Sequence, residues 1–185
     1  ANIRSLALAS DTILTMAKGE SGKFTVQPVK TPVHTLLAET LHRLEVLYEK
    51  KGIEMELDLP GQPVPVMADP AALTIAVNEL VSNAIQFTPE KGKISMGLAE
   101  SPAGAEKVRF YIQDSGPGMT PEQLAALVAA TSGAGPVEAG RPGVGLGMVR
   151  SIVEAHGSPL EIKSEPGKGS RFSFDLPLWA ETPAA

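Results

Sequence analysis

Cysteine is absent from the 185 residues of the chain, so the chain can form no disulfide and offers no thiolate to a metal ion. Its three histidines, His34, His42 and His156, are scattered and lack the spacing of metal ligands. We therefore expect no structural zinc site.

Basic residues are in the minority, with 16 Lys and Arg against 21 Asp and Glu and a formal net charge of -5. No cluster of Lys or Arg has the form that binds a phosphate backbone, which argues against nucleic acid as a partner. Apolar runs also stay short of the roughly 20 residues that a membrane-spanning helix needs, and the start has no signal-peptide pattern. We therefore expect a cytoplasmic protein, with no direct membrane contact in this part of the chain.

A composition of 43% hydrophobic and 20% charged residues is typical of one globular domain with a short appendage. Near the start, core-type positions recur at alternating gaps of three and four residues, as in a helix that pairs with another helix. These positions are Ile3, Leu6, Ser10, Ile13 and Ala17. The same pattern also suits a single amphipathic helix that lies on its own domain. We divide the chain into a helix and linker at 1–22, a domain at 23–180 and a tail at 181–185.

The periodicity of apolar residues in the domain predicts a mixture of helices and strands. Residues 24–30 are expected to be extended, and a helix is expected from Pro32 to about Lys51, where Gly52 is a natural end. A half-buried strand is predicted where apolar residues alternate with acidic ones, at Ile53, Met55, Leu57 and Leu59. Further expected elements are strands at 64–68, 92–99 and 107–113, and helices after Asp69, at 121–130 and after 143–147.

The helix after Asp69 carries polar side chains beside its apolar stripe. Asp69 and Pro70 suit the N-cap and first position of a helix. Glu79 and Asn83 are four residues apart, so they share one face, and Gln86 lies near them. Asn83 offers a neutral oxygen that suits Mg²⁺, and Glu79 could orient or deprotonate a nucleophile near a terminal phosphate. Taken singly, each could equally be a solvated helix residue.

The strand at 107–113 is followed by Asp-Ser-Gly-Pro-Gly. Strand alternation puts Asp114 on the same apolar face as Phe110 and Ile112, where a carboxylate needs partners. Asp114 could accept a hydrogen bond from an exocyclic amine such as that of adenine, while Gly116 and Gly118 let the backbone approach a flat base. The same residues also make an excellent turn.

A third block, Gly-Val-Gly-Leu-Gly at 143–147, is expected to precede a helix. Free amides at a helix start can hold anionic oxygens, which would place Gly143, Val144, Gly145, Leu146 and Gly147 at phosphates. Such a glycine pattern alone is weak. The preceding stretch is rich in Gly, Ala, Ser and Pro, and we interpret it as a lid whose basic residue, Arg141, contacts phosphate.

In this order the three blocks resemble the catalytic, ATP-binding domain of sensor histidine kinases, within the GHKL ATPase superfamily. Residues 68–94 resemble its N box with the lead-in, DSGPGM its G1 box, and the segment from Gly143 to 178 its G2 box and terminal strands. The resemblance implies an α+β fold, a two-layer α/β sandwich with a mixed sheet on three helices and a short helix before it. It also implies ATP and Mg²⁺ as ligands, Asn83 as the Mg²⁺ ligand, and Asp114 as the adenine partner. Residues 1–22 then resemble the end of a dimerisation-stem helix.

The sequence departs from the family pattern at several points. No histidine stands in the His-Glu-x-x-x-Pro context of the phosphoacceptor, so this segment alone is not expected to phosphorylate itself. Glu79 replaces a common asparagine, Gln86 replaces a common basic residue, and the lid lacks a phenylalanine. These changes leave the grip on phosphate and the docking of the lid open.

The sequence therefore predicts the ATP-dependent kinase part of a two-component system, which transfers the γ-phosphate to a histidine on a stem helix. A response regulator and a second copy of the chain are the expected partners, and the whole protein is compatible with a membrane-bound sensor. Three alternatives remain: a serine kinase of the anti-sigma type with Glu79 as base, a degenerate module that senses nucleotide or docks a partner, and an ATP hydrolase.

Overall fold

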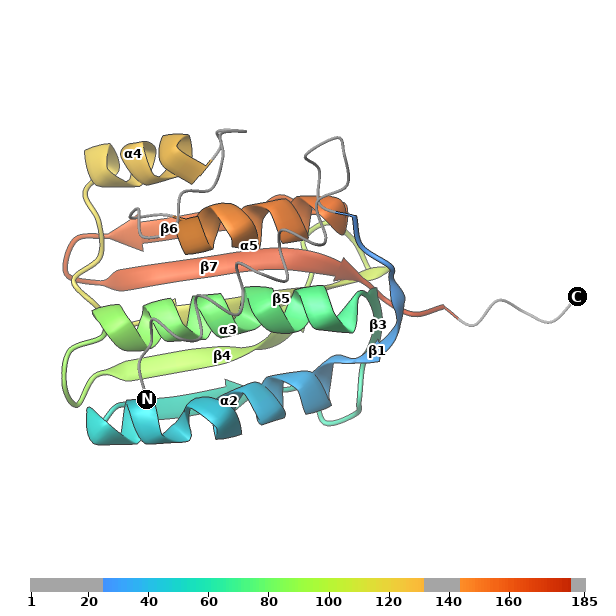
Figure 1. The fold of residues 1–185 in the computed structure, drawn as a ribbon, viewed down its shortest axis with the longest axis horizontal. Coiled ribbons are helices and arrows are strands. Elements are labelled where there is room, and N and C mark those ends of the chain that lie inside the picture. Colours follow the sequence, from blue (N-terminus) through green and yellow to red (C-terminus); the bar gives the residue numbers. More distant parts are fainter. Residues whose placement is uncertain (1–24, 132–143, 181–185) are drawn as a thin grey trace, which may run out of the picture.

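A mixed five-stranded sheet is the framework of the protein. The computed structural model describes residues 25–131 and 144–180. The strands of the sheet are β2 (Glu54–Asp58), β4 (Lys93–Glu100), β5 (Lys107–Asp114), β6 (Glu161–Glu165) and β7 (Gly169–Pro177). They lie in the order β2-β4-β5-β7-β6 (Figure 1). β2 runs parallel to β4 and the other neighbouring pairs are antiparallel, so the sheet is mixed as expected.

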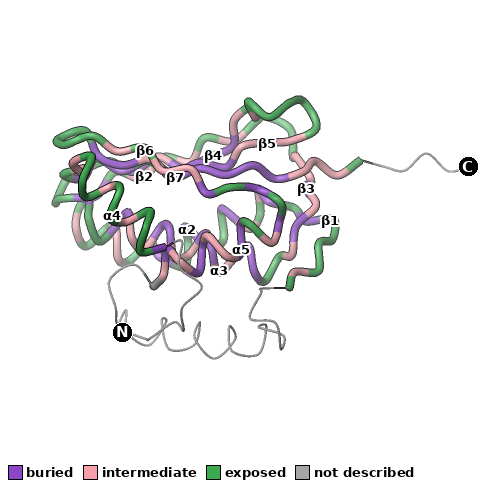
Figure 2. Tube along the Cα trace, turned by 90° about the horizontal axis from the view of Figure 1, so that it is seen from above, coloured by how far each residue is buried: buried purple, intermediate pink, exposed green. Residues whose placement is uncertain are grey.

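The helices cover one face of this sheet. α2 (Val33–Lys50), α3 (Pro70–Phe87) and α5 (Val144–Ala155) form one layer, and α4 (Pro121–Thr131) lies beyond α5 (Figures 1 and 2). The two-layer sandwich with three helices on the sheet is therefore confirmed, and α4 is the short helix expected at 121–130. None of the helices described is long and apolar enough to cross a membrane.

The core lies between the two layers. Apolar residues of the central strands are buried, among them Met96, Phe110 and Phe174. Figure 2 marks the buried positions along these strands in purple. The rings of Phe110 and Phe174 lie at the centre of the core, with their centroids 4.9 Å apart. The alternation expected at 107–113 is confirmed, because Val108, Phe110 and Ile112 are all buried.

The outer face of the sheet is polar where the inner face is apolar. Arg109 on β5 donates from Nη1 to Glu161 at 2.7 Å and from Nη2 to Asp175 at 2.8 Å. These hydrogen bonds from Arg109 hold the pKa of Asp175 below its usual range. The two faces thus carry the binary pattern that a sheet covered on one side requires.

The first strand differs from the expected extended segment at 24–30. β1 occupies Val29–Pro32, and α2 begins at Val33 rather than at Pro32. β1 pairs with β3 (Pro65–Ala68), and the buried hydroxyl of Thr31 donates to the carbonyl oxygen of Ala68 at 2.8 Å. The strand therefore starts where a partner strand is available, which local sequence does not reveal. The helix expected at 1–22, the expected lid at 132–143 and the tail at 181–185 lie outside the described residues.

Asp69 fastens the start of α3. Its Oδ1 accepts hydrogen bonds from the amides of Ala71 and Ala72 at 3.0 and 3.1 Å, and its Oδ2 accepts from the amide of Gln27 at 3.0 Å. Its own amide donates to Nε2 of His156 at 2.9 Å. Burial of the carboxyl opposes ionisation, but the amides of Gln27, Ala72 and Ala71 outweigh it and lower the pKa of Asp69.

Asp69→Ala is expected to lower the free energy of unfolding by about 1 kcal/mol at pH 7, because the cap of α3 is lost. The pKa of Asp69 is lowered on folding, so its contribution is complete above the ordinary value of 3.8 and is lost as the pH falls through the folded pKa. Urea unfolding at several pH values, followed by the single tryptophan, Trp179, measures both effects.

Asp69→Asn is the matched control, since asparagine caps a helix about as well but does not titrate. It should keep the cap bonds from Ala71 and Ala72, lose the bond from the amide of Gln27, and remove this part of the acid dependence. Equal stability of the Ala variant and the parent at pH 7 would contradict the capping role.

Candidate functional site

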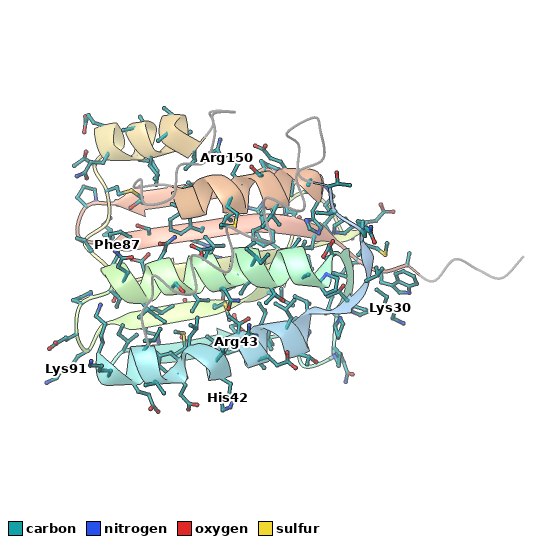
Figure 3. The ribbon with its side chains drawn as sticks, in the orientation of Figure 1. Lys30, His42, Arg43, Phe87, Lys91 and Arg150 are labelled. Carbon is teal, nitrogen blue, oxygen red and sulfur yellow. The ribbon has the colours of Figure 1, made fainter. Side chains whose placement is uncertain are left out.

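One stripe of α3 carries an acid, an amide and an aromatic ring. Glu79, Asn83 and Phe87 follow one another at intervals of four residues and therefore share a face of the helix. Glu79 and Asn83 are half-buried, and the side chain of Phe87 is 58% exposed at the end of the helix (Figure 3). No hydrogen bond joins the Asn83 side chain to another residue of 25–131 or 144–180, which leaves its oxygen available to a ligand.

The glycine block lies against this stripe. A Cβ atom added to Gly145 would stand 2.5 Å from Oε2 of Glu79, so the carboxylate lies directly over the glycine backbone. Glu79 and Gly145 are far apart in sequence, and their contact brings the first and third motifs together. A side chain at position 145 would displace the Glu79 carboxylate, which is the flexible end of its side chain.

The sequence predicted that the glycine block precedes the helix as a loop, and this prediction is wrong. α5 begins at Val144, so Gly145 and Gly147 lie in its first turn, where Leu146 is buried in the core. The apolar contact of Leu146 explains why the helix starts early. The first four amides of a helix have no partner within it. The amides expected to bind an anion therefore lie in the first turn of α5 and not in a loop before it.

Asp114 ends β5 inside the core, as the strand alternation predicted. It is 6% exposed, and its Oδ1 accepts hydrogen bonds from the amides of Gly116 at 2.8 Å and Ser170 at 3.2 Å. Both bonds end on Oδ1, which leaves Oδ2 for a further donor. Burial raises the pKa of Asp114, and the amides of Gly116 and Ser170 offset this only in part.

The turn after Asp114 is packed so closely that it accepts only glycine. Gly118 has a φ of +66°, and a Cβ there would lie 1.9 Å from the carbonyl oxygen of Glu165 at the end of β6. A Cβ at Gly116 would lie 2.7 Å from Oδ1 of Asp114 and 2.9 Å from the carbonyl oxygen of Phe87. The end of α3 and the Asp114 turn therefore meet at Gly116.

These contacts put the three motifs along a single helix. Glu79 meets the start of α5, and Phe87 meets the Asp114 turn two helical turns later, about 12 Å along the axis. Asn83 lies between these two points. The resulting row can contact both ends of an elongated ligand.

Some of the expected site residues lie outside this description. Arg141 and Gly143 are outside the described residues, as is the side chain of Val144. Among the residues that are described, no group of three or more His, Cys, Asp or Glu could hold a metal ion. Two shallow hollows of about 240 and 230 Å³ open on the outer side of the sheet end, around Gln113 and Lys168. Neither hollow is lined by a residue of α3 or α5, but the second is lined by Asp114 and Ser115 and therefore adjoins the Asp114 end of this site.

Phe87 is the residue that sequence reasoning missed. An exposed aromatic residue at the end of a core helix is unusual, and its place four residues after Asn83 was the available signal. Its importance depends on the contact between its carbonyl oxygen and Gly116, which only the fold creates.

The model of one protein family, described as "Histidine kinase-, DNA gyrase B-, and HSP90-like ATPase" (HATPase_c), matches residues 68–180. The chain belongs to the HATPase_c family. The matched range holds all three motifs, and a sensory kinase and a histidine kinase are among the curated relatives. The convergence of the motifs on α3 is thus a feature of an ATPase domain of the histidine-kinase type.

Three curated relatives illustrate the similarity. The virulence sensor protein BvgS of Bordetella bronchiseptica is 37% identical over 182 residues, which are 95% of this chain and 14% of BvgS. The adaptive-response sensory kinase SasA of a Synechococcus strain is 31% identical over 154 residues, 82% of this chain and 40% of SasA. The circadian input-output histidine kinase CikA of a Synechocystis strain is 30% identical over 175 residues, 90% of this chain and 22% of CikA. The chain spans less than half of each relative.

Solved structures of histidine kinases share the fold of this HATPase_c domain. The catalytic domain of ThkA superposes with a TM-score of 0.69 at 24% identity, covering 82% of this chain and 96% of that one. Full-length ShkA, solved in complex with AMPPNP, superposes with a TM-score of 0.71 at 24% identity, covering 98% of this chain and 37% of ShkA. The two-layer arrangement of sheet and helices is therefore that of histidine kinase catalytic domains.

Gly118→Ala is expected to lower the free energy of unfolding by more than about 2 kcal/mol, because the new methyl group meets backbone and the positive φ is strained. Gly61→Ala is the control, since no atom lies within 4 Å of its added Cβ and its φ is not in the left-handed region. The control should stay within about 1 kcal/mol of the parent in urea unfolding. Similar losses for both variants would refute the close approach of the turn to β6 and β7.

Proposed function

We propose that this HATPase_c domain binds Mg-ATP and transfers the γ-phosphoryl group to a histidine on a stem helix, as the catalytic part of a two-component sensor kinase. The observation that carries the proposal is the meeting of the three motifs along α3, at Gly145 and at Gly116. Family membership supplies the ATPase class, and the geometry supports the assignment of individual residues.

Asp114 would read the adenine. Its Oδ2 is left over after the amides of Gly116 and Ser170 have bonded to Oδ1, so it can accept a hydrogen bond from the exocyclic amine. The absence of a side chain at Gly116 keeps the space beside this carboxylate open, and a methyl group there would fill it. The exposed ring of Phe87 could cover one face of the base, since an aromatic ring packs well on a flat base.

Asn83 and the first turn of α5 would hold the charged end. Bound ATP would supply the reactive phosphoanhydride, and Mg²⁺ would neutralise its oxygens. Mg²⁺ needs only one or two protein ligands beside phosphates and waters, so Asn83 suffices without an acidic cluster. Amides of Gly145, Leu146 and Gly147 lie at a helix start, where anions are favoured, and Gly143, Val144 and Arg141 would extend this contact.

In the phosphoryl transfer, this domain would position ATP and neutralise the charge of its phosphates. A neutral imidazole attacks the γ-phosphorus through one ring nitrogen, a phosphorus–nitrogen bond forms, and the bond to the β–γ bridging oxygen breaks to release ADP. The proton on the other ring nitrogen leaves to a base or to water. His156 is no candidate acceptor, because Nε2 accepts from Asp69 and Nδ1 donates to Ile152 at 2.8 Å within the core.

The partners follow from this function. The proposed phosphohistidine would pass its phosphoryl group to a response regulator, and residues 1–22 would join a stem that pairs two copies of the chain. We also propose that the domain occupies 23–180 and works in the cytoplasm.

A serine kinase is the second candidate, because an acid occupies position 79 and lies at the start of α5. In that reading Glu79 takes the proton of a serine hydroxyl on a partner protein. The product would be acid-stable phosphoserine, whereas phosphohistidine is labile in acid.

Asp114→Asn is expected to weaken ATP binding by about 1 to 3 kcal/mol, because an amide donor would face the amine of the base. Folding raises the pKa of Asp114, so the ionised carboxylate costs stability at neutral pH and its removal should not lower the free energy of unfolding. Calorimetric titration and urea unfolding test the two parts. Glu90→Gln, which removes an exposed carboxylate after α3, should bind ATP as the parent does. Equal affinity of the parent for ATP and GTP would contradict the role of Asp114.

A separately prepared stem that carries the histidine should acquire acid-labile phosphate from labelled ATP when mixed with this chain and Mg²⁺. Asn83→Ala should abolish most of the transfer, because the metal ligand is lost, while the fold remains. Glu79→Gln should reduce the rate strongly if the carboxylate is the base, and little if another group takes the proton. ADP release without any phosphoprotein would refute the kinase function in favour of an ATP hydrolase.

A further inference from the structure

Lys51 lies at the junction between the ends of α2 and α3. Its backbone is fixed by the end of α2, where the Lys51 amide donates to Tyr48 and the amide of Gly52, with a φ of +62°, donates to Glu49. From this point its Nζ donates to three backbone carbonyl oxygens, those of Ile85 at 2.7 Å, Gln86 at 3.1 Å and Thr88 at 2.7 Å. One ammonium group thus uses all three of its donors on the end of α3.

The end of α3 has no charge of its own to oppose its dipole. The last turn of α3 contains no basic residue, although carbonyl groups at a helix end carry partial negative charge and lack partners within the helix. Lys51 supplies both the charge and the donors from a different helix. The backbone carbonyl of Lys51 also accepts from the amide of Lys91 at 3.0 Å, so the residue holds the connection after α3 on both sides.

This end of α3 is the part that meets the Asp114 turn. The carbonyl oxygen of Phe87 lies between the carbonyls held by Lys51 and contacts Gly116. Beyond the connection, the amide of Lys93 donates to Oγ of Ser115 at 2.8 Å, which ties the same segment to the turn. Figure 3 shows Phe87 and Lys91 at the same end of the molecule, where α2 and α3 both finish.

We propose that Lys51 is a positioning residue for the nucleotide: it fixes the last turn of α3 and thereby the distance between Asn83, Phe87 and the Asp114 turn. It would act through the backbone of 85–88 and would not touch the ligand. This inference rests on the proposed binding of an adenine nucleotide.

The test compares Lys51→Met, Lys51→Arg and Lys50→Met. Lys50 is the preceding, exposed residue of α2, so its variant controls for the loss of one positive charge. Amide hydrogen exchange of the peptide 82–90 is measured without ligand, and Mg-ADP affinity is measured by calorimetry at a temperature where each variant is folded. Lys51→Met should speed exchange in 82–90 and weaken Mg-ADP binding about tenfold, the effect of losing charged hydrogen bonds. Lys51→Arg should lie closer to the parent, and Lys50→Met should match it.

Unchanged exchange in 82–90, or faster exchange with unchanged affinity, would overturn the positioning role. An equal loss of affinity in Lys50→Met would do the same, because it would point to charge alone. If the parent binds no adenine nucleotide, the proposed function fails instead, and the exchange experiment still decides whether Lys51 holds the end of α3.

Discussion

The fixation of α3 at both of its ends is the constraint on which the rest of the structure depends. At the start, the carboxylate of Asp69 binds two amides of the helix and one of the preceding chain, while its amide binds His156 after α5. At the end, Lys51 binds the last carbonyl groups. A helix with both ends bonded to other elements cannot slide or rotate without breaking several hydrogen bonds at once. The face of α3 that carries Glu79, Asn83 and Phe87 therefore keeps its orientation.

The turn that meets the end of α3 contains a carboxyl group whose ionised form is disfavoured by burial in the core, that of Asp114. Asp114 continues an apolar strand face into the interior, and burial raises its pKa although two amides bond to it. Natural sequences break the rule of apolar interiors mainly at functional or strained sites. Gly116 in the turn beside Asp114 has no side chain that could cover the carboxylate.

Local periodicity was sufficient to predict most elements and the inward direction of Asp114, because both follow from alternation within one strand or helix. It was not sufficient for β1, whose position is decided by pairing with β3, more than thirty residues later. Phe87 and Lys51 escaped prediction for the same reason. Phe87 matters because it contacts Gly116, and Lys51 matters because it binds the end of α3. No pattern within either segment predicts these contacts.

Gly145 and Gly147 show why a glycine motif does not by itself predict the conformation of the backbone. Glycine in a helix costs about 1 kcal/mol relative to alanine, so a glycine pattern is ordinarily taken as a loop. Here Leu146 anchors the turn in the core, and the carboxylate of Glu79 occupies the place of a side chain at Gly145. Glycine at position 145 therefore leaves room for this carboxylate, and the same lack of a side chain leaves the first-turn backbone open to an anion. A substitution at Gly145 that improved the helix would displace the carboxylate of Glu79 from this position.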